Sequence, residues 1–242
     1  MPRYKLTIEF DGANFSGWQI QPDSRTIEGE LEKAFSKILQ QPIDLIGQGR
    51  TDAGVHAKGQ VAHVDLLDSV QPERLIFGVN GLVGGEIEIH SIEKVNPEFH
   101  ARFDAISREY EYLILKKKTP LKRGLSWHPM FALDVEKMKS CMELLSGEFD
   151  FKGFSKFNEE NYTTLCTIQY CELLETDEEL VFKIRANRFL RNMVRRLVGT
   201  MVEVGKGKIE VSEFQEILEN PDNELPAFTA PAKGLVLSKV FY

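Results

Sequence analysis

Apolar residues follow two kinds of spacing along this chain, and each kind predicts a different element. Alternation of apolar and polar residues predicts strands with one buried face over 4–10, 60–64, 86–95, 107–115, 164–172 and 180–186. Helical spacing predicts helices over 26–39, 72–80, 134–146, 189–200 and 212–219. We expect Gly81 and Gly147 to end two of these helices. The mixture of elements predicts an α+β protein.

Length and composition allow a large core. The chain has 242 residues, of which 42% are hydrophobic, so it can form one large or two compact domains. The division we expect is an N-terminal half over 1–105 and a C-terminal half over 106–242. No apolar run approaches the length of a membrane span, and the N-terminus leads into a strand pattern and not into a signal peptide. We therefore expect a soluble, cytoplasmic protein with no membrane partner.

The charge is unevenly distributed. The formal net charge is −7, which argues against a simple basic nucleic-acid binder. However, residues 1–105 carry 10 basic and 16 acidic side chains, whereas residues 106–242 carry 20 and 21. Five arginines between positions 185 and 196 have no acidic residue between them. They could form either a solvated charged face or a face that contacts phosphate groups, and the sequence favours neither. We expect Arg188 and Arg191 to lie on the same helix as Arg195.

Cysteines and histidines do not suggest a metal site. The three cysteines cannot make a disulfide framework, and two of them, Cys166 and Cys171, are expected on opposite faces of one strand. His56 and His63 have no acidic residue or cysteine at ligand spacing. We interpret both histidines as structural and expect no metal ion.

Residues 49–57 (Gly-Arg-Thr-Asp-Ala-Gly-Val-His-Ala) form the most informative stretch. It is polar, contains two glycines and follows a short apolar run, which predicts a loop leaving an ordered element. An acidic residue, Asp52, lies two positions after Arg50 and two before Gly54. On local chemistry alone, an aspartate before Ala-Gly is more often a turn residue than a catalytic group.

The whole nine-residue string, however, resembles the signature of the tRNA pseudouridine synthase A family. The resemblance implies that Asp52 is the catalytic residue. An earlier stretch, with Phe10-Asp11-Gly12, Phe15 and Gly17-Trp18-Gln19, is similar to the family's opening motif. By themselves, Phe15 and Trp18 could simply cap the core.

Three later stretches extend the resemblance over nearly the whole chain. Residues 99–115 are similar to the family's second motif, which implies that Tyr110 packs against the target uracil, with Tyr112 the less favoured candidate. Residues 189–200 resemble the third motif, which implies that Arg195 supports the catalytic aspartate. Residues 230–237 resemble the last motif, which implies that Leu235 forms a wall of the base pocket. Arg188 and Arg191 depart from the expected pattern and are candidates for phosphate contacts.

The resemblance also implies a fold and an activity. The fold would be two ferredoxin-like or RRM-like halves that share a mainly antiparallel sheet, with the active site in a cleft between them. The activity would be isomerisation of uridine to pseudouridine at positions 38, 39 and 40 of the tRNA anticodon stem-loop, by a homodimer. A nucleophilic carboxylate, held by Arg50 and Arg195, can perform this reaction without a cofactor. The sequence does not say whether it attacks the sugar or the base, or first removes a sugar proton.

Two other classes of protein are weighed against this hypothesis. A non-catalytic RNA-binding protein with RRM-like halves would need exposed aromatic residues in characteristic strings, and residues 108–115 are not such a string. An aspartate-dependent hydrolase would usually show a second carboxylate or a metal cluster in a similar context. The sequence shows neither.

Overall fold

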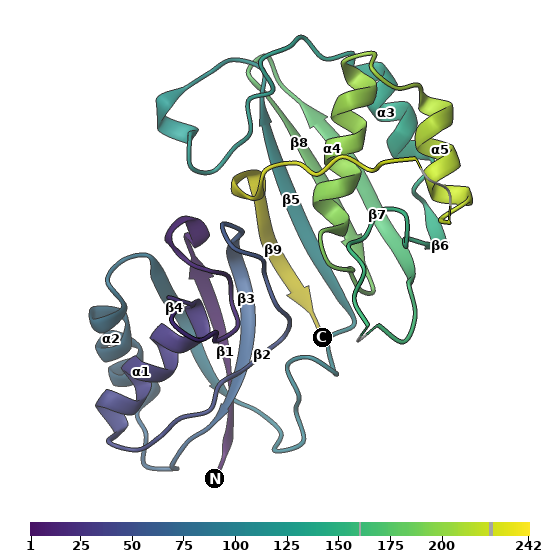
Figure 1. Cartoon of the computed structure of the whole chain (residues 1–242). Coiled ribbons are helices and arrows are strands. Elements are labelled where there is room, and N and C mark those ends of the chain that lie inside the picture. Colours follow the sequence, from purple (N-terminus) through teal and green to yellow (C-terminus); the bar gives the residue numbers. More distant parts are fainter. Residues whose placement is uncertain (160, 223–224) are drawn as a thin grey trace. The chain divides into compact units, whose positions relative to one another are not determined.

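The computed structural model describes residues 1–159, 161–222 and 225–242, and these divide into two compact units. Unit 1 comprises Met1–Ile106 and Val236–Tyr242, and unit 2 comprises Ser107–Leu235 (Figure 1). The expected division at 105/106 therefore differs from the observed one at the C-terminus. The reason is that the last strand, β9 (Leu235–Phe241), pairs in parallel with a strand of unit 1.

Unit 1 contains strands and helices in a ferredoxin-like order. In chain order they are β1 (Arg3–Phe10), the 3-10 turn η1 (Gly12–Asn14), α1 (Ile27–Leu39), β2 (Ile46–Gly47), β3 (His56–Asp65), α2 (Pro72–Val83) and β4 (Ile87–Lys94). The strand order is β4-β1-β3, with β2 and β9 both on the free side of β3, and all these pairs except β3–β9 are antiparallel. Helices α1 and α2 lie side by side against one face (Figure 1). The order β-α-β-β-α-β and the placement of β1 between β3 and β4 define the ferredoxin-like arrangement.

Helix α1 forms where the sequence predicts it. The side chain of Thr26 accepts a hydrogen bond from the Gly29 backbone N–H, which caps the first turn, and Glu28 and Glu30 lie near the positive end of the helix dipole. The apolar side chains at helical spacing are buried; they are Ile27, Leu31, Ala34 and Phe35. The predicted strand over 4–10 is likewise confirmed, with Tyr4, Leu6, Ile8 and Phe10 buried.

Helix α2 continues past its predicted end. Gly81 does not stop the helix, which runs to Val83 and ends at Gly84, whose φ is 74°. A glycine inside a helix costs only about 1 kcal/mol relative to alanine. The left-handed conformation at Gly84, followed by a second one at Gly85, is what ends it.

Unit 2 contains a second set of strands and three helices. Its elements are β5 (Ser107–Leu115), η2 (Pro120–Lys122), α3 (Val135–Glu143), β6 (Gly147–Asp150), β7 (Leu165–Glu175), β8 (Glu179–Ala186), α4 (Met193–Gly205), α5 (Val211–Glu219) and η3 (Ala232–Gly234). The strand order is β5-β8-β7-β6, and the β5–β8, β8–β7 and β7–β6 pairs are antiparallel. Helices α3, α4 and α5 pack against one another on one side of these strands (Figure 1). The α+β class and the mainly antiparallel sheet are thus confirmed.

Two helix predictions in unit 2 need correction. Helix α3 ends at Glu143 and not just before Gly147, which instead begins β6 with a φ of 116°. The helix predicted over 189–200 begins only at Met193, because Asn192 takes the left-handed conformation with φ 62°. Eleven of the 13 residues of α4 are buried, so it is a core helix and does not carry a row of exposed arginines.

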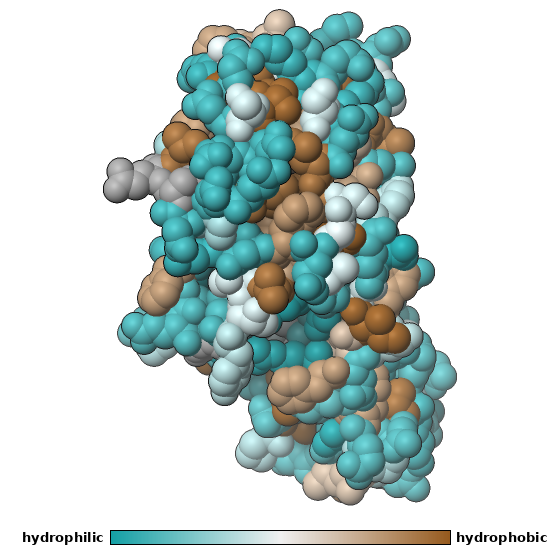
Figure 2. Space-filling model, turned by 90° about the vertical axis from the view of Figure 1, so that its right-hand side faces the viewer, coloured by the Kyte–Doolittle hydropathy of each residue, from teal (hydrophilic) through white to brown (hydrophobic). Residues whose placement is uncertain are grey.

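The surface matches the charged composition. Figure 2 shows one face of the molecule on which hydrophilic side chains predominate, with hydrophobic ones between them. In the part of the chain that the structure describes, no helix is both long and apolar enough to cross a membrane.

Candidate functional site

The Asp52 loop connects β2 to β3 in unit 1. The predicted loop is confirmed for 48–55, whereas His56 and Ala57 already belong to β3. The Val55 backbone N–H donates to the Asp52 carbonyl at 3.1 Å, and Gly54 has a φ of 75°. Asp52 therefore begins a tight turn, with its side chain half-buried at the edge of the unit.

The segment after β1 lies directly against this loop. The Trp18 backbone N–H donates to the Thr51 carbonyl at 3.1 Å, and the Gly12 N–H donates to Nδ1 of His56 at 3.1 Å. A Cβ at Gly12 would lie 2.0 Å from the Val55 carbonyl oxygen, and one at Gly17 would lie 2.6 Å from that of Thr51. Only glycine allows such a close approach of two backbones. The opening motif is therefore a support for the Asp52 loop, which we did not foresee from its sequence.

Strand β3 holds the loop from its other side. The fully buried side chain of Gln60 donates through Nε2 to the Gly49 carbonyl at 3.0 Å. The Gln48 backbone N–H donates to the Val61 carbonyl at 2.8 Å. The backbone that carries Asp52 is thus fixed at both ends. The signal that could have identified Gln60 is a polar residue within a run that is otherwise buried.

Arg50 lies on the exposed part of the same loop. Its positive charge reaches Glu28 of α1, where it lowers the pKa of a carboxyl whose pKa burial raises above its ordinary value. The charge of Arg50 therefore acts on a second acidic residue of unit 1, in addition to the role that the sequence predicts for it beside Asp52.

His56 and His63 have structural partners, as we interpreted them. Both imidazoles are buried, and each accepts a backbone N–H at Nδ1, from Gly12 for His56 and from Ala101 for His63. Within the described ranges, no group of three or more histidine, cysteine or acidic side chains is placed to hold a metal ion.

In unit 2, the two tyrosines of β5 have different surroundings. Tyr112 is fully buried, its hydroxyl donates to the Pro231 carbonyl at 2.7 Å, and burial raises its pKa. Tyr110 is half-buried, and its ring meets that of Phe189 edge to face at 5.1 Å. Tyr110 is therefore the tyrosine with surface available for a ligand, which agrees with the preference from the sequence.

Arg195 connects the first turn of α4 to the segment before Leu235. Its Nε donates to the Ala230 carbonyl at 2.8 Å, the Ala230 N–H donates back to the Arg195 carbonyl at 2.9 Å, and Nη1 donates to Oδ1 of Asn192 at 3.2 Å. The segment continues to Leu235, which is 6% exposed. Unit 2 thus brings Arg195 and the stretch that leads to Leu235 together through this reciprocal pair of bonds.

Arg188 and Arg191 are not on α4, so the prediction that they share its helix with Arg195 is wrong. Both precede Asn192, whose left-handed conformation separates them from the helix. Nη2 of Arg188 lies 3.4 Å from Oδ1 of Asn161, whereas Arg191 is exposed and its carbonyl accepts the Lys156 N–H. The two arginines therefore differ from each other as well as from Arg195.

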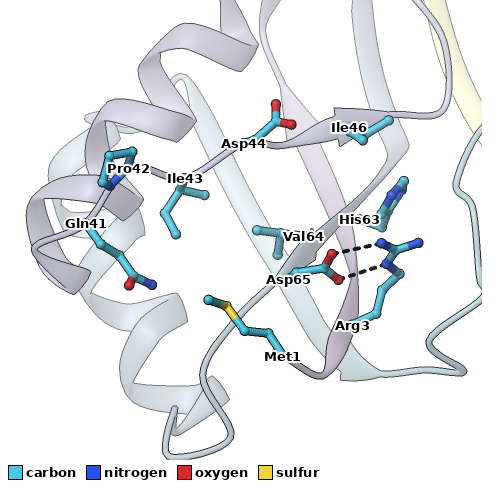
Figure 3. A pocket seen from close by; sticks show the side chains of 10 residues that line it. All are labelled: Met1, Arg3, Gln41, Pro42, Ile43, Asp44, Ile46, His63, Val64 and Asp65. Atoms are coloured by element: carbon cyan, nitrogen blue, oxygen red, sulfur yellow. Dashed lines mark hydrogen bonds and ion pairs between the residues drawn. The ribbon is translucent and has the colours of Figure 1, made fainter.

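A pocket of about 320 Å³ in unit 1 is separate from the Asp52 loop. Figure 3 shows its lining, which includes Arg3 and Asp65, joined by two hydrogen bonds of 2.8 Å, together with His63. His63 and Asp65 lie at the end of β3, whereas the Asp52 loop precedes the start of the same strand. The residues that line the pocket do not include any of the loop over 48–55.

The sequence comparisons cover both units. The profile of the family described as tRNA pseudouridine synthase matches residues 6–104 and 141–242. Proteins named tRNA pseudouridine synthase A are similar along their whole length. That of Bacteroides thetaiotaomicron is 39% identical over 100% of this chain and 91% of its own, and that of Porphyromonas gingivalis is 40% identical over 100% and 98%. That of Chlorobaculum tepidum is 40% identical over 98% of this chain and 97% of its own. The ranges that match the profile contain the Asp52 loop, and the full-length alignments also include Tyr110. The chain therefore belongs to the tRNA pseudouridine synthase family.

Proposed function

We propose that this protein isomerises uridine to pseudouridine at positions 38, 39 and 40 of the tRNA anticodon stem-loop. The observation that carries the proposal is the rigid turn that begins at Asp52, in a chain similar along its whole length to proteins named tRNA pseudouridine synthase A. The protein would act in the cytoplasm and as a homodimer.

The reaction needs a nucleophile and no external reagent. The N-glycosidic bond breaks, the uracil turns, and a carbon–carbon bond forms between C5 and the sugar. The proton on C5 is released and N1 gains one, so atoms and electrons balance without an oxidant or reductant. Asp52 would supply the carboxylate. Attack on the sugar, attack on the base and initial removal of a sugar proton all remain compatible with this assignment.

We assign supporting roles to residues of both units. Arg50 and Arg195 would stabilise the Asp52 carboxylate by their positive charge, Tyr110 would pack against the uracil, and Leu235 would form an apolar wall for the base. A base that leaves its stack needs such a platform and such a wall.

Recognition of tRNA would rest on shape and phosphate contacts. An enzyme that accepts three neighbouring positions cannot depend on reading one base, and phosphate contacts suit this tolerance. Arg191, with its exposed side chain, is the strongest candidate for such a contact, and Arg188 is the second.

The test is modification of a defined tRNA transcript by the purified protein. Carbodiimide labelling followed by primer extension maps pseudouridine to single nucleotides. We expect label at uridines 38, 39 and 40, undiminished by EDTA when the transcript stays folded, and none in a transcript with cytidine at these positions. Binding of the transcript without any label would contradict the proposal and would favour a non-catalytic RNA-binding protein.

A further inference from the structure

Trp18 connects helix α1 to the Asp52 loop. The side chain is 2% exposed, and its indole Nε1 donates to Oε1 of Glu28 at 3.1 Å. Its backbone N–H donates to the Thr51 carbonyl at 3.1 Å, and its carbonyl accepts the Glu28 N–H at 3.0 Å. Its ring lies so close to Gly47 that a Cβ there would be 2.5 Å from Nε1. Trp18 therefore contacts β2, which leads into the loop, as well as the loop itself.

Glu28 fixes the indole from the first turn of α1. Its second carboxylate oxygen, Oε2, accepts the Ile20 backbone N–H at 2.9 Å, so the two oxygens hold two donors of the segment over 18–20. Burial opposes the charged form of this carboxylate, while the two hydrogen bonds and the charge of Arg50 favour it. A glutamine could offer only one acceptor oxygen, because its amide NH₂ would face a donor.

The path from Glu28 to the reacting residue is short. The Thr51 carbonyl that Trp18 binds belongs to the peptide group whose nitrogen is that of Asp52. Next to Trp18, Gly17 has a φ of 97°, and a Cβ there would lie 2.6 Å from the same carbonyl oxygen. A shift of the indole is therefore transmitted through one backbone hydrogen bond to the peptide group of Asp52. Misplacement of a reacting group by about 1 Å can reduce a rate about a hundredfold.

We propose that Glu28 and Trp18 are positioning residues for Asp52. Glu28 holds the indole, and Trp18 holds the Thr51–Asp52 peptide group in the orientation that the reaction needs. This inference rests on the proposed function, since it assigns to Asp52 the reacting carboxylate, but the rigidity of the loop can be measured without RNA.

Two variants weaken the contact of Glu28 with the segment over 18–20 and keep most of the packing. Trp18→Phe loses the Nε1–H and keeps a six-membered ring, and Glu28→Gln loses one acceptor. The control is Glu32→Gln, one turn later on α1, where a half-buried carboxylate with a raised pKa accepts the Leu45 N–H at 2.8 Å. In both test variants we expect the single-turnover rate at saturating tRNA to fall at least about tenfold, with the Kd for tRNA changed by less than about twofold. The control should keep the wild-type rate.

The double variant separates positioning from loss of stability. Because both changes act on the same contact between Glu28 and the segment over 18–20, the losses in rate should not multiply in Trp18→Phe with Glu28→Gln. Multiplicative losses, or an equal loss in Glu32→Gln, would overturn the proposal. An unchanged rate in both single variants would also overturn it.

Hydrogen exchange gives the readout that does not depend on catalysis. In the free protein we expect the amide of Val55, which closes the Asp52 turn, to exchange about tenfold faster in both test variants and at the wild-type rate in the control. Unchanged exchange would refute the positioning role even if the enzyme is active. Faster exchange in the test variants of a protein that forms no pseudouridine would support the positioning role and would contradict only the proposed function.

Discussion

The Asp52 loop of unit 1 and the arginine-rich segment over 188–196 of unit 2 are held in opposite ways. In the loop, backbone groups bind backbone groups and an amide side chain, as at Trp18 and Gln60, and the close approaches of Gly12 and Gly17 fix its position. In the arginine segment, charged side chains bind backbone carbonyls. Nε of Arg195 binds the Ala230 carbonyl, and Nη1 of Arg196 binds that of Ser155 at 2.7 Å.

The difference shows that residues of a family motif can have two physical roles: some position the backbone of a reacting residue, and others hold their own unit together. In unit 1 the glycines and polar residues around Asp52 position the backbone that carries its side chain. In unit 2, Arg195 and Arg196 bind carbonyls of their own unit, so the removal of either has a cost in stability as well as any cost in activity. A variant of an arginine must therefore be tested for both.

The largest effect is expected at Asp52. Asp52→Asn keeps the shape of the side chain and removes the nucleophile, so pseudouridine formation should fall at least ~10³-fold, or about 4 kcal/mol. Because the loop is held by its backbone, the unfolding temperature and the affinity for tRNA should hardly change. Tritium release from 5-³H-uridine tRNA and thermal unfolding measure these quantities. The control is Asp23→Asn, an exposed loop residue with φ 54° that asparagine tolerates. Near wild-type turnover of Asp52→Asn would remove the proposed mechanism.

The second-largest effect is expected at Arg195, and its variants can break the comparison between the Asp52 loop and the arginine-rich segment. We expect Arg195→Ala to lower the single-turnover rate about a hundredfold, with little change in tRNA affinity, and to lower the free energy of unfolding by about 1–3 kcal/mol because the Ala230 carbonyl loses a charged donor. Arg195→Lys keeps the charge and should recover part of the rate.

The matched control for this experiment is Arg196→Ala. Arg196 also lies in the first turn of α4, and its Nη1 binds the Gly153 and Ser155 carbonyls. Its loss should cost similar stability and leave the rate at saturating tRNA unchanged. If the two alanine variants lose the same rate, Arg195 has only a structural role.

Acid can sharpen the comparison, because the imidazole of His63 in unit 1 accepts a hydrogen bond, whereas unit 2 uses guanidinium groups that stay charged. Burial, followed by the charges of Arg3 and His100, lowers the pKa of His63 from its ordinary 6.5 to about 4. The folded protein therefore resists protonation of His63. Its contribution is fully present above pH 6.5 and is lost as the pH falls towards 4. The free energy of unfolding should fall on the order of 3 kcal/mol through this window from His63 alone.

The measurement is urea unfolding between pH 7 and pH 4.5. His63→Gln keeps an oxygen for the Ala101 N–H and cannot be protonated, so it should lose this part of the pH dependence. His90→Gln serves as the control, because His90 is exposed and pairs with Glu9. An identical pH dependence in wild type and His63→Gln would show that this imidazole does not control the acid response.

The smallest effect is expected at Arg191. Its exposed side chain has room for a phosphate, so Arg191→Ala should weaken tRNA binding a few-fold and reduce the slope of log K against log salt by about one unit. Arg191→Lys should keep the slope. Arg188→Ala should change it less, since Arg188 already lies beside Asn161. Equal slopes for wild type and Arg191→Ala would exclude this contact.

Local pattern alone determined much of the fold. Alternating burial over Arg3–Phe10 and Glu179–Ala186 and the capped helix at Thr26 follow from spacing and from side-chain capping, which neighbouring residues decide. The resemblance identified the Asp52 loop, because its nine residues are contiguous and their order is visible in the chain.

Only the tertiary structure decided the ends of several elements and the surroundings of the site. The left-handed conformation of Asn192 decides where α4 begins. The contacts of Gly12, Gly17 and Trp18 with the loop join residues that are far apart in sequence. The pairing of β9 with β3 does the same for the two ends of unit 1. Such contacts depend on which surfaces meet after the chain has folded, and no local pattern of hydrophobic and polar residues encodes them.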